Sequence, residues 1–368
     1  MFDRRLFQYF DWWLMGLTLV LCSVGLMTIY SAVTAGESDP QRVLWLKQGV
    51  WYAIGLAAMI MTFIVNYKVL DKLGGGIYAI SVILLVLVLI VGKHVSGSTR
   101  WLVVGPVTIQ PSELAKIAVI IVMAKLYAKR AKVDGFRLKE LFVPFLTVAI
   151  PFFLIVKQPD LGTAMLIVFI AASMTVYVKI ERRSMIWLIG SSAVLVLMAW
   201  FFFLKGYQKQ RILTFLDPDR DPLGTGYHII QSKIAIGSGM IFGKGFLKGT
   251  QNALSFLPEQ HTDFIISVLA EEWGFAGTGA VLFLYMILVL WGLNIALGCR
   301  DAFGTILAVG ISSMIFWEIF INAGMVMGLM PVVGVPLPLI SYGGSSVVTT
   351  MIGIGILISI SMRKFVVE

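Results

Sequence analysis

The chain has 368 residues, of which 58% are hydrophobic and only 13% are charged. That charged share is about half of the share in an ordinary soluble domain, and the mean hydropathy is +0.90. Both values argue against a soluble globular protein and indicate a polytopic membrane protein. The net charge of +9 is typical of the basic residues that gather in cytoplasmic loops, so we do not expect nucleic-acid binding.

Ten apolar segments have the length of a membrane-spanning helix or come close to it. Because open strand edges cannot face lipid, we expect all ten to be helices. The expected fold class is therefore an all-α polytopic membrane protein with a single domain over residues 1–368. The eighth segment is long, which predicts a tilted helix or one that extends past the bilayer. The segments are 12–33, 46–66, 76–92, 112–128, 141–157, 161–178, 185–204, 264–297, 303–328 and 346–362.

The distribution of Lys and Arg predicts how the chain crosses the membrane. Basic residues are frequent in the segments placed inside, such as 125–139 and 179–183, and sparse in the short outer loops. This asymmetry places both termini in the cytoplasm and the long loop 205–262, between the seventh and eighth helices, outside. Within that loop, YHIIQSKIAIGSG (227–239) predicts a short amphipathic helix in the outer interface. The basic residues of the short outer loops are Arg42, Lys47, Lys93, Arg100 and Lys157.

The stretch FLPEQHTDFIISVLAEEWG, residues 256–274, changes from polar to apolar at Asp263. An Asp before an apolar run is a common helix N-cap. Glu259 and His261 lie close by, however, and a carboxylate at a lipid–water boundary is partly desolvated, which raises its pKa toward that of a general base. Capping and catalysis both stay open for Asp263.

The motif QPDLGT, residues 158–163, repeats this arrangement at another expected outer boundary. Asp160 precedes an apolar helix and fits an N-cap. The alternative is a second outer carboxylate that holds a cation or orients a substrate.

The motif QPSELAKI, residues 110–117, places two charges at the start of an apolar segment. Glu113 and Lys116 are three residues apart, so they share a helix face and can form an ion pair. Ionisable residues inside a span are costly and mark functional sites. Glu113 also fits a capping box after Pro111, and both interpretations stay open for it. For Lys116, which lies deeper, we predict a functional role.

The stretch PVVGVPLPLISYGGSS, residues 331–346, is apolar but contains three prolines, which exclude a straight helix. Irregular backbone at membrane depth must line a cavity or be packed inside protein. The turn at 341–346 fits either an anion site made of backbone N–H groups or a plain glycine turn. For the acidic residues Glu271, Glu272 and Glu318, an ion pair within the bundle and a partner contact both stay open.

Five motifs together resemble the signature blocks of the SEDS family (shape, elongation, division and sporulation). They extend across nearly the whole chain in the family's order, and the motifs between 227 and 251 are more similar to elongation members than to division members. The five motifs are QPSELAKI, QPDLGT, LDPDRDPLGTGYHIIQSKIAIGSG, GKGFLKGTQNALSFLPEQHTDFIISVLAEEWG and GVPLPLISYGGSS.

The resemblance implies a peptidoglycan glycosyltransferase of the cytoplasmic membrane that polymerises lipid II on the outer face during cell elongation and rod-shape maintenance. The implied partners are a class B penicillin-binding protein (a transpeptidase) and other membrane proteins of the elongation complex. Asp263 matches the catalytic Asp of the family, and Glu113 and Lys116 match the paired charges of its central cavity. Further matching cavity residues are Arg100, Asp160, Arg211 and Ser341.

The resemblance also implies dependence on a divalent cation, Mg²⁺ or Mn²⁺, with Asp263 as a possible ligand and without a nucleotide cofactor. Two other functional classes stay open. One is a lipid II flippase that uses the same charges, and the other is a non-catalytic scaffold of the elongation machinery.

Overall fold

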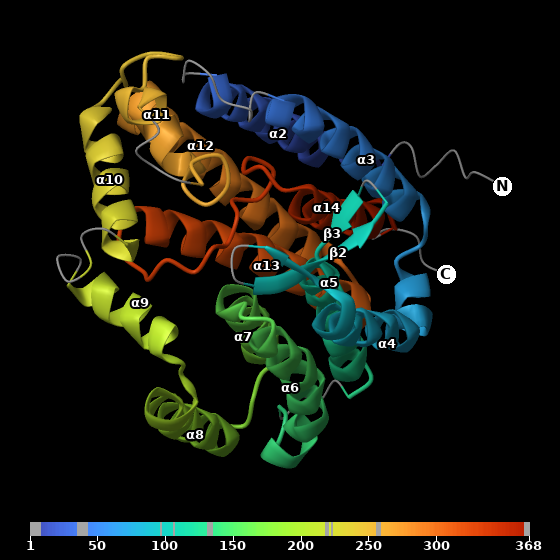
Figure 1. The fold of residues 1–368 in the computed structure, drawn as a ribbon. Coiled ribbons are helices and arrows are strands. Elements are labelled where there is room, and N and C mark those ends of the chain that lie inside the picture. The colour runs from blue at the N-terminus through green and yellow to red at the C-terminus, as the bar shows by residue number, and fades with distance from the viewer. Residues whose placement is uncertain are drawn as a thin grey trace.

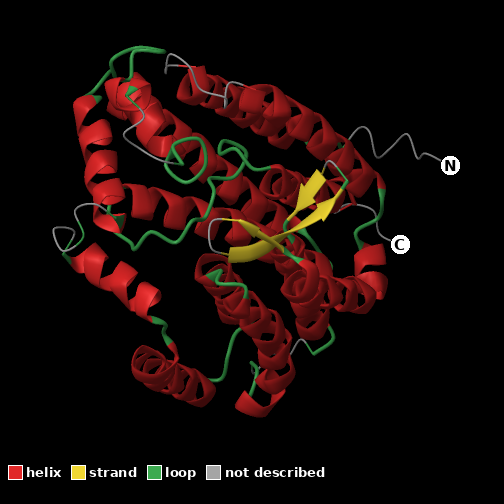
Figure 2. Cartoon of the chain, viewed as in Figure 1, coloured by secondary structure: helices red, strands yellow, loops and turns green. Residues whose placement is uncertain are grey.

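The computed structural model describes residues 9–34, 43–95, 98–105, 107–130, 135–217, 221, 224–254 and 259–363. Most of these residues are helical, and the helices pack into one bundle (Figures 1 and 2). The α-helices are α2 (Trp12–Thr34), α3 (Leu44–Ile64), α4 (Lys68–Val91), α5 (Pro111–Ala128), α6 (Phe142–Lys157), α7 (Leu161–Tyr177), α8 (Arg182–Met198), α9 (Gly206–Leu216), α10 (Thr225–Ser238), α11 (Thr250–Ala253), α12 (Ile265–Gly298), α13 (Ala302–Val326) and α14 (Gly344–Arg363). The short helices η2 (Leu138–Leu141) and η3 (Ala199–Phe203) precede α6 and follow α8.

A helix lies over each of the ten apolar segments. Within the described residues, eight helices are long and apolar enough to cross a membrane, which makes the chain a multi-pass membrane protein. α5 and α7 are not among the eight. α5 carries Glu113, Lys116 and Lys125, and α7 has only 17 residues. The count of ten spanning helices and the location of the termini, which lie outside the described residues together with Arg42, therefore stay predictions.

The all-helical expectation is wrong for the segment between α4 and α5. Here β1 (Lys93–Val95), β2 (Ser98–Val104) and β3 (Val107–Ile109) form a small antiparallel sheet in the order β1–β2–β3. Leu102 pairs with Ile109, and the β-branched and aromatic residues on both sides of Gly105 favour such a hairpin. Gly105 has φ +62°, a conformation that suits glycine. The sheet is drawn in yellow in Figure 2 and carries Arg100.

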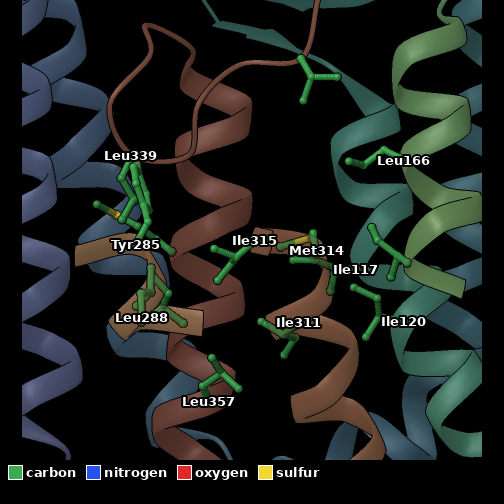
Figure 3. Close-up of a cluster of buried hydrophobic side chains, with 14 of the residues drawn as sticks. Ile117, Ile120, Leu166, Tyr285, Leu288, Ile311, Met314, Ile315, Leu339 and Leu357 are labelled. Carbon is green, nitrogen blue, oxygen red and sulfur yellow. The ribbon is translucent and has the colours of Figure 1, made fainter. Parts of the chain in front are cut away.

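α13 is the central helix of the bundle. It packs against α5 and α7 on one side and against α12 on the other, and its side chains form the middle of a buried apolar cluster (Figure 3). Residues of α5 and α7 lie to the right of α13 in this view, and residues of α12, α14 and the 331–343 segment lie to the left. The labelled members of the cluster are Ile117, Ile120, Leu166, Tyr285, Leu288, Ile311, Met314, Ile315, Leu339 and Leu357.

The described parts of the long loop include the helices α9, α10 and α11. One further piece of the loop enters a break in α12. Gly274 has φ +68° and ψ −166°, so the helix is interrupted there. Backbone N–H groups of Lys244 and Gly245 donate to the carbonyls of Glu271 and Glu272, and N–H groups beyond the break donate to the carbonyls of Met240 and Ile241. The segment GSGMIFGKG, whose sequence does not match a phosphate-binding loop, thus replaces the missing helical hydrogen bonds.

Glu271 strengthens this attachment. One oxygen of its buried carboxylate accepts hydrogen bonds from Lys244 Nζ at 2.7 Å, from the Thr250 amide at 2.8 Å and from the Gln251 amide at 3.1 Å. An ion pair within the protein is therefore the correct interpretation of Glu271. α10, which covers the predicted amphipathic segment, packs on α12 beside this attachment.

Replacement of Gly274 by Ala tests the helix break. A Cβ at this position would lie 2.3 Å from Gly243 N, and the backbone conformation is one that only glycine adopts readily. We expect Gly274→Ala to lower the free energy of unfolding by at least about 1–3 kcal/mol, measured by thermal unfolding in detergent. Gly279→Ala in the same helix is the matched control, because its Cβ meets open space. Equal stability of the two variants would contradict the assigned break.

Candidate functional site

Asp263 lies in a tight turn directly before α12. The amides of Thr262 and Asp263 donate to the carbonyl of Glu259 at 3.1 and 3.2 Å. Phe264 occupies the N-cap position of α12, and no side chain caps the helix there. The Asp263 side chain is partly exposed, and no hydrogen bond from the described residues reaches its carboxylate. The N-cap interpretation of Asp263 is therefore wrong, and the carboxylate is available for chemistry.

The charges around Asp263 set its affinity for a proton. The pKa of Asp263 is raised to about 6, chiefly by burial and also by the carboxylates of Glu259 and Asp160, against the opposing effect of Arg100 and Arg211. A carboxylate with a pKa near the working pH can both accept and release a proton. The structure thus brings four of the sequence-predicted residues, Asp263, Asp160, Arg100 and Arg211, into one electrostatic environment.

Asp160 is held at the start of α7 by three side chains. It is the N-cap, because it accepts from the Thr163 amide at 3.3 Å and from Thr163 Oγ1 at 2.9 Å. Gln110 Nε2 donates to Oδ2 at 3.3 Å, and Arg100 Nη1 lies 3.6 Å from Oδ1. Arg100 also donates to the Pro159 carbonyl. The helix-cap interpretation is correct for Asp160, and the same carboxylate also orients Arg100.

The residues 331–343, called here the proline segment, form one wall of the site. The segment is irregular, as the three prolines predict. Arg211 Nη1 donates to the Val332 carbonyl at 3.2 Å. A Cβ added to Gly334, which has φ +71°, would lie 3.2 Å from Asp263 Oδ2. Gly162 in the first turn of α7 packs so closely that its Cβ would lie 2.5 Å from the Val333 carbonyl. The segment therefore touches Arg211, the start of α7 and Asp263 through consecutive residues.

Ser341 is buried, and its hydroxyl is fully used within the protein. It donates to the Thr262 carbonyl at 2.6 Å and accepts from the Leu337 amide at 2.8 Å. The Tyr342 amide adds a bond to the His261 carbonyl at 2.9 Å. Ser341 thus fastens the proline segment to the turn that carries Asp263.

Glu113 and Lys116 form the expected ion pair, but a third residue joins them. Lys116 Nζ lies 2.7 Å from Glu113 Oε2 and 2.5 Å from Glu318 Oε1 on α13. All three side chains are almost completely buried, with exposed fractions of at most 4%. The ammonium is therefore enclosed by two carboxylates. Of the two interpretations of Glu113, the ion pair is correct and the capping box is wrong, because no side chain caps α5.

Two residues of α13 complete the site that the motifs only outlined. Sequence analysis left Glu318 undecided and did not single out Asn322. The two lie four residues apart on α13, so they share a face of the helix. Glu318 binds Lys116, and Asn322 Nδ2 donates to the Asp263 carbonyl at 3.1 Å and to the Val335 carbonyl at 2.7 Å. The available signal was a charged and an amide residue spaced four positions apart in an apolar span.

A divalent cation at this site would have to share its coordination with a phosphate ligand. Mg²⁺ is commonly bound by one or two carboxylates together with substrate phosphates. The Asp263 carboxylate, which receives no hydrogen bond from the described part of the chain, has Glu259 as its acidic neighbour. The residues that the structure describes contain no cluster of three or more His, Cys, Asp or Glu side chains able to hold a metal by themselves.

Comparison with known proteins places the chain among cell-wall enzymes. The FtsW/RodA/SpoVE family model, described as a cell cycle protein, matches residues 12–365. The peptidoglycan glycosyltransferase MrdB of Escherichia coli (strain K12) is 42% identical over 352 residues, 94% of this chain and 93% of MrdB. The peptidoglycan glycosyltransferase RodA of Treponema pallidum is 33% identical over 426 residues, 96% of this chain and 98% of that protein.

Two solved structures have the same fold. A chain from a study of how a peptidoglycan synthase complex coordinates polymerization and crosslinking superposes with a TM-score of 0.82 and 31% identity, covering 97% of this chain and 99% of that chain. The rod shape determining protein RodA of Thermus thermophilus gives a TM-score of 0.72 and 28% identity, covering 97% and 98%.

Removal of Lys116 tests the buried ion cluster. Lys116→Met leaves two buried carboxylates without their counter-ion, so we expect the free energy of unfolding to fall by about 3–5 kcal/mol. Lys125→Met on the same helix is the matched control. Its exposed partner Asp71 lies 3.8 Å away, so we expect a change of about 0–1 kcal/mol.

Thermal unfolding in detergent measures both variants. Glu318→Gln, added to Lys116→Met, should recover part of the loss because it removes one of the two unpaired charges. Equal losses for Lys116→Met and Lys125→Met would contradict the buried cluster.

Proposed function

The chain belongs to the FtsW/RodA/SpoVE family, also called SEDS, and we therefore propose that it is a peptidoglycan glycosyltransferase that polymerises lipid II. The observation that carries the proposal is the Asp263 carboxylate, which is partly exposed and receives no hydrogen bond from the described residues. Its pKa is raised to about 6, chiefly by burial and against the positive charges of Arg100 and Arg211. A base and two fixed cations are what the transfer of a sugar from a diphosphate requires.

In the proposed reaction, two lipid-linked disaccharides meet at Asp263. The carboxylate takes the proton from the 4-hydroxyl of the acceptor sugar, and that oxygen attacks the anomeric carbon of the donor. A C–O bond forms between the sugars while the bond from the anomeric carbon to the diphosphate oxygen breaks. Polyprenyl diphosphate leaves with the electron pair. A single displacement inverts the anomeric centre and needs one base rather than a carboxylate nucleophile.

Arg100 and Arg211 stabilise the charge that develops on the leaving diphosphate. Both are oriented before the substrate arrives, Arg100 by Asp160 at 3.6 Å and Arg211 by the Val332 carbonyl at 3.2 Å. Fixed cations lower the barrier more than mobile ones because no reorganisation is needed during the reaction. Lys116 does not contact the diphosphate in this proposal, because its ion pairs with Glu113 and Glu318 would have to break first. Its role is to hold α5 and α13 together.

A divalent cation, Mg²⁺ or Mn²⁺, would be held by Asp263 and Glu259 together with the diphosphate. When bound, it neutralises charge on the departing group. In this alternative, Asp263 is a metal ligand and the base lies elsewhere.

The proposed setting is the outer face of the cytoplasmic membrane, during cell elongation and rod-shape maintenance. Both termini are cytoplasmic in this proposal, and the loop 205–262 faces outward. We expect a class B penicillin-binding protein as the partner that cross-links the product. The solved chain from a peptidoglycan synthase complex supports a partner of this kind.

Replacement of Asp263 by Asn tests the assignment of the base. We expect Asp263→Asn to lower lipid II polymerisation by at least about 100-fold, since general-base catalysis contributes about 10²–10⁴-fold. The assay is glycan formation on a gel, with the purified protein and a class B penicillin-binding protein whose transpeptidase is blocked. Asp301→Asn is the matched control, because Asp301 caps α13 and Asn caps a helix equally well.

The outcomes separate the functional classes. Polymer from wild type and from Asp301→Asn, but not from folded Asp263→Asn, supports glycosyl transfer at Asp263. Equal polymer from all three contradicts the role of Asp263. Absence of polymer from wild type with a verified substrate and partner favours the flippase or the scaffold, because flipping has no meaning in detergent.

The pH dependence of kcat/KM tests whether Asp263 acts as a base, because this parameter reports the pKa values of the free enzyme. A base is active only when it is deprotonated, so a pKa of about 6 predicts that kcat/KM falls below that pH and levels off above it. A metal ligand behaves differently, because a bound cation favours the charged carboxylate and moves the acidic limb well below pH 6. The profile is measured at lipid II concentrations below KM and at fixed Mg²⁺. A limb that lies well below pH 6 would contradict the base and support the metal ligand.

A further inference from the structure

Asn322 joins two parts of the site through one buried amide group. Its side chain is completely buried, and Nδ2 donates to the Asp263 carbonyl at 3.1 Å and to the Val335 carbonyl at 2.7 Å. The first carbonyl belongs to the turn with the proposed base, and the second belongs to the proline segment. Both N–H groups of the amide are therefore used to hold these two pieces of irregular backbone at a set separation.

That separation controls the position of the Asp263 carboxylate. Gly334 directly precedes Val335, and an added Cβ at Gly334 would be 3.2 Å from Asp263 Oδ2. The same segment supplies the Val332 carbonyl that orients Arg211. A shift of the proline segment against the turn would therefore move the carboxylate relative to one of the two cations that balance its charge.

α13 holds Asn322 in a fixed position. One turn earlier, Glu318 of the same helix is bonded to Lys116 at 2.5 Å, which locks α13 to α5. The helix also packs against α5, α7 and α12. An amide on a helix that is fixed in this way can set a distance more accurately than a loop residue can.

We infer that Asn322 is a positioning residue for glycosyl transfer, which sets the Asp263 carboxylate against Arg211 and the acceptor hydroxyl through the two carbonyls that it bridges. This inference rests on the proposed function of Asp263. Asn322 does not touch the substrate, so its loss should slow the chemical step and leave substrate binding nearly unchanged.

The test compares kcat with KM for lipid II in the complex with a penicillin-binding protein whose transpeptidase is blocked. We expect Asn322→Ala to lower kcat by about 10- to 100-fold, because displacements of about 1 Å have effects of that size, and to change KM by less than about threefold. Tyr78→Phe is the matched control. It also removes a hydrogen bond from a side chain to a backbone carbonyl, that of Thr147 at 2.9 Å, but between α4 and α6, and kcat should stay unchanged.

A double-mutant cycle tests whether Asn322 acts through the proline segment. Gly334→Ala adds a methyl group against the Asp263 carboxylate. If Asn322 holds Gly334 in place, removal of the Asn322 side chain lets the proline segment move away from the added methyl group. The decrease in log kcat for the double variant should then be smaller than the sum of the two single decreases. Fully additive decreases would overturn the inference.

Two further results decide between a positioning role and a purely structural one. If Asn322→Ala only reduces the fraction of folded protein, kcat per folded molecule, measured on the monodisperse fraction from size exclusion, will equal that of wild type and the inference is wrong. A rise in KM without a change in kcat also overturns it. A wild-type complex that makes no polymer contradicts the proposed function itself, a result distinct from normal polymerisation by both wild type and Asn322→Ala.

Discussion

Irregular backbone inside an apolar bundle has carbonyl groups that no helix satisfies, and the rest of this site depends on how those groups are bonded. Side chains from four helices supply the hydrogen bonds to the proline segment. Arg211 of α9 and Asn322 of α13 bond to its first half, and Tyr285 of α12 bonds to Pro338 in its second half. Gln48 and Tyr52 of α3 bond to the carbonyls of Ser341 and Leu339. The helices are thereby organised around a strip of peptide, and that strip forms the wall against which Asp263 lies.

The buried charges follow the same requirement. Lys116 has two carboxylate partners, one on its own helix and one on α13, so the ion cluster connects helices rather than facing an open space. α13 therefore has two polar tasks on one face, with Glu318 holding α5 and Asn322 holding the Asp263 turn. A helix that is apolar elsewhere can serve in this way only because each polar group finds a partner inside the protein.

Much of the fold was predictable because hydrophobic length is a strong signal in membrane proteins, and a helix lies over every segment expected to be one. The sheet at 93–109 was missed because a short alternating stretch is read as a loop when the surrounding segments are long and apolar. The motifs led to Asp263 and Asp160, the family resemblance added Arg100 and Arg211, and the structure brings these four together. Sequence could not decide whether Asp263 or Asp160 caps a helix, because a start of the helix one residue earlier or later changes which residue is the N-cap. It also could not pair Lys116 with Glu318, which lies 202 positions away.

The break in α12 at Gly274 makes this helix two mechanical elements instead of one. The part before the break begins beside Asp263 and is bonded through Glu271 and Glu272 to the loop, while the first residues after the break are bonded to Met240 and Ile241 of the same loop. A force that acts on the loop is thus delivered to both sides of the break at once. A glycine usually provides a hinge, but here the loop bridges Gly274 with hydrogen bonds on both sides, so the two parts of the helix are held together.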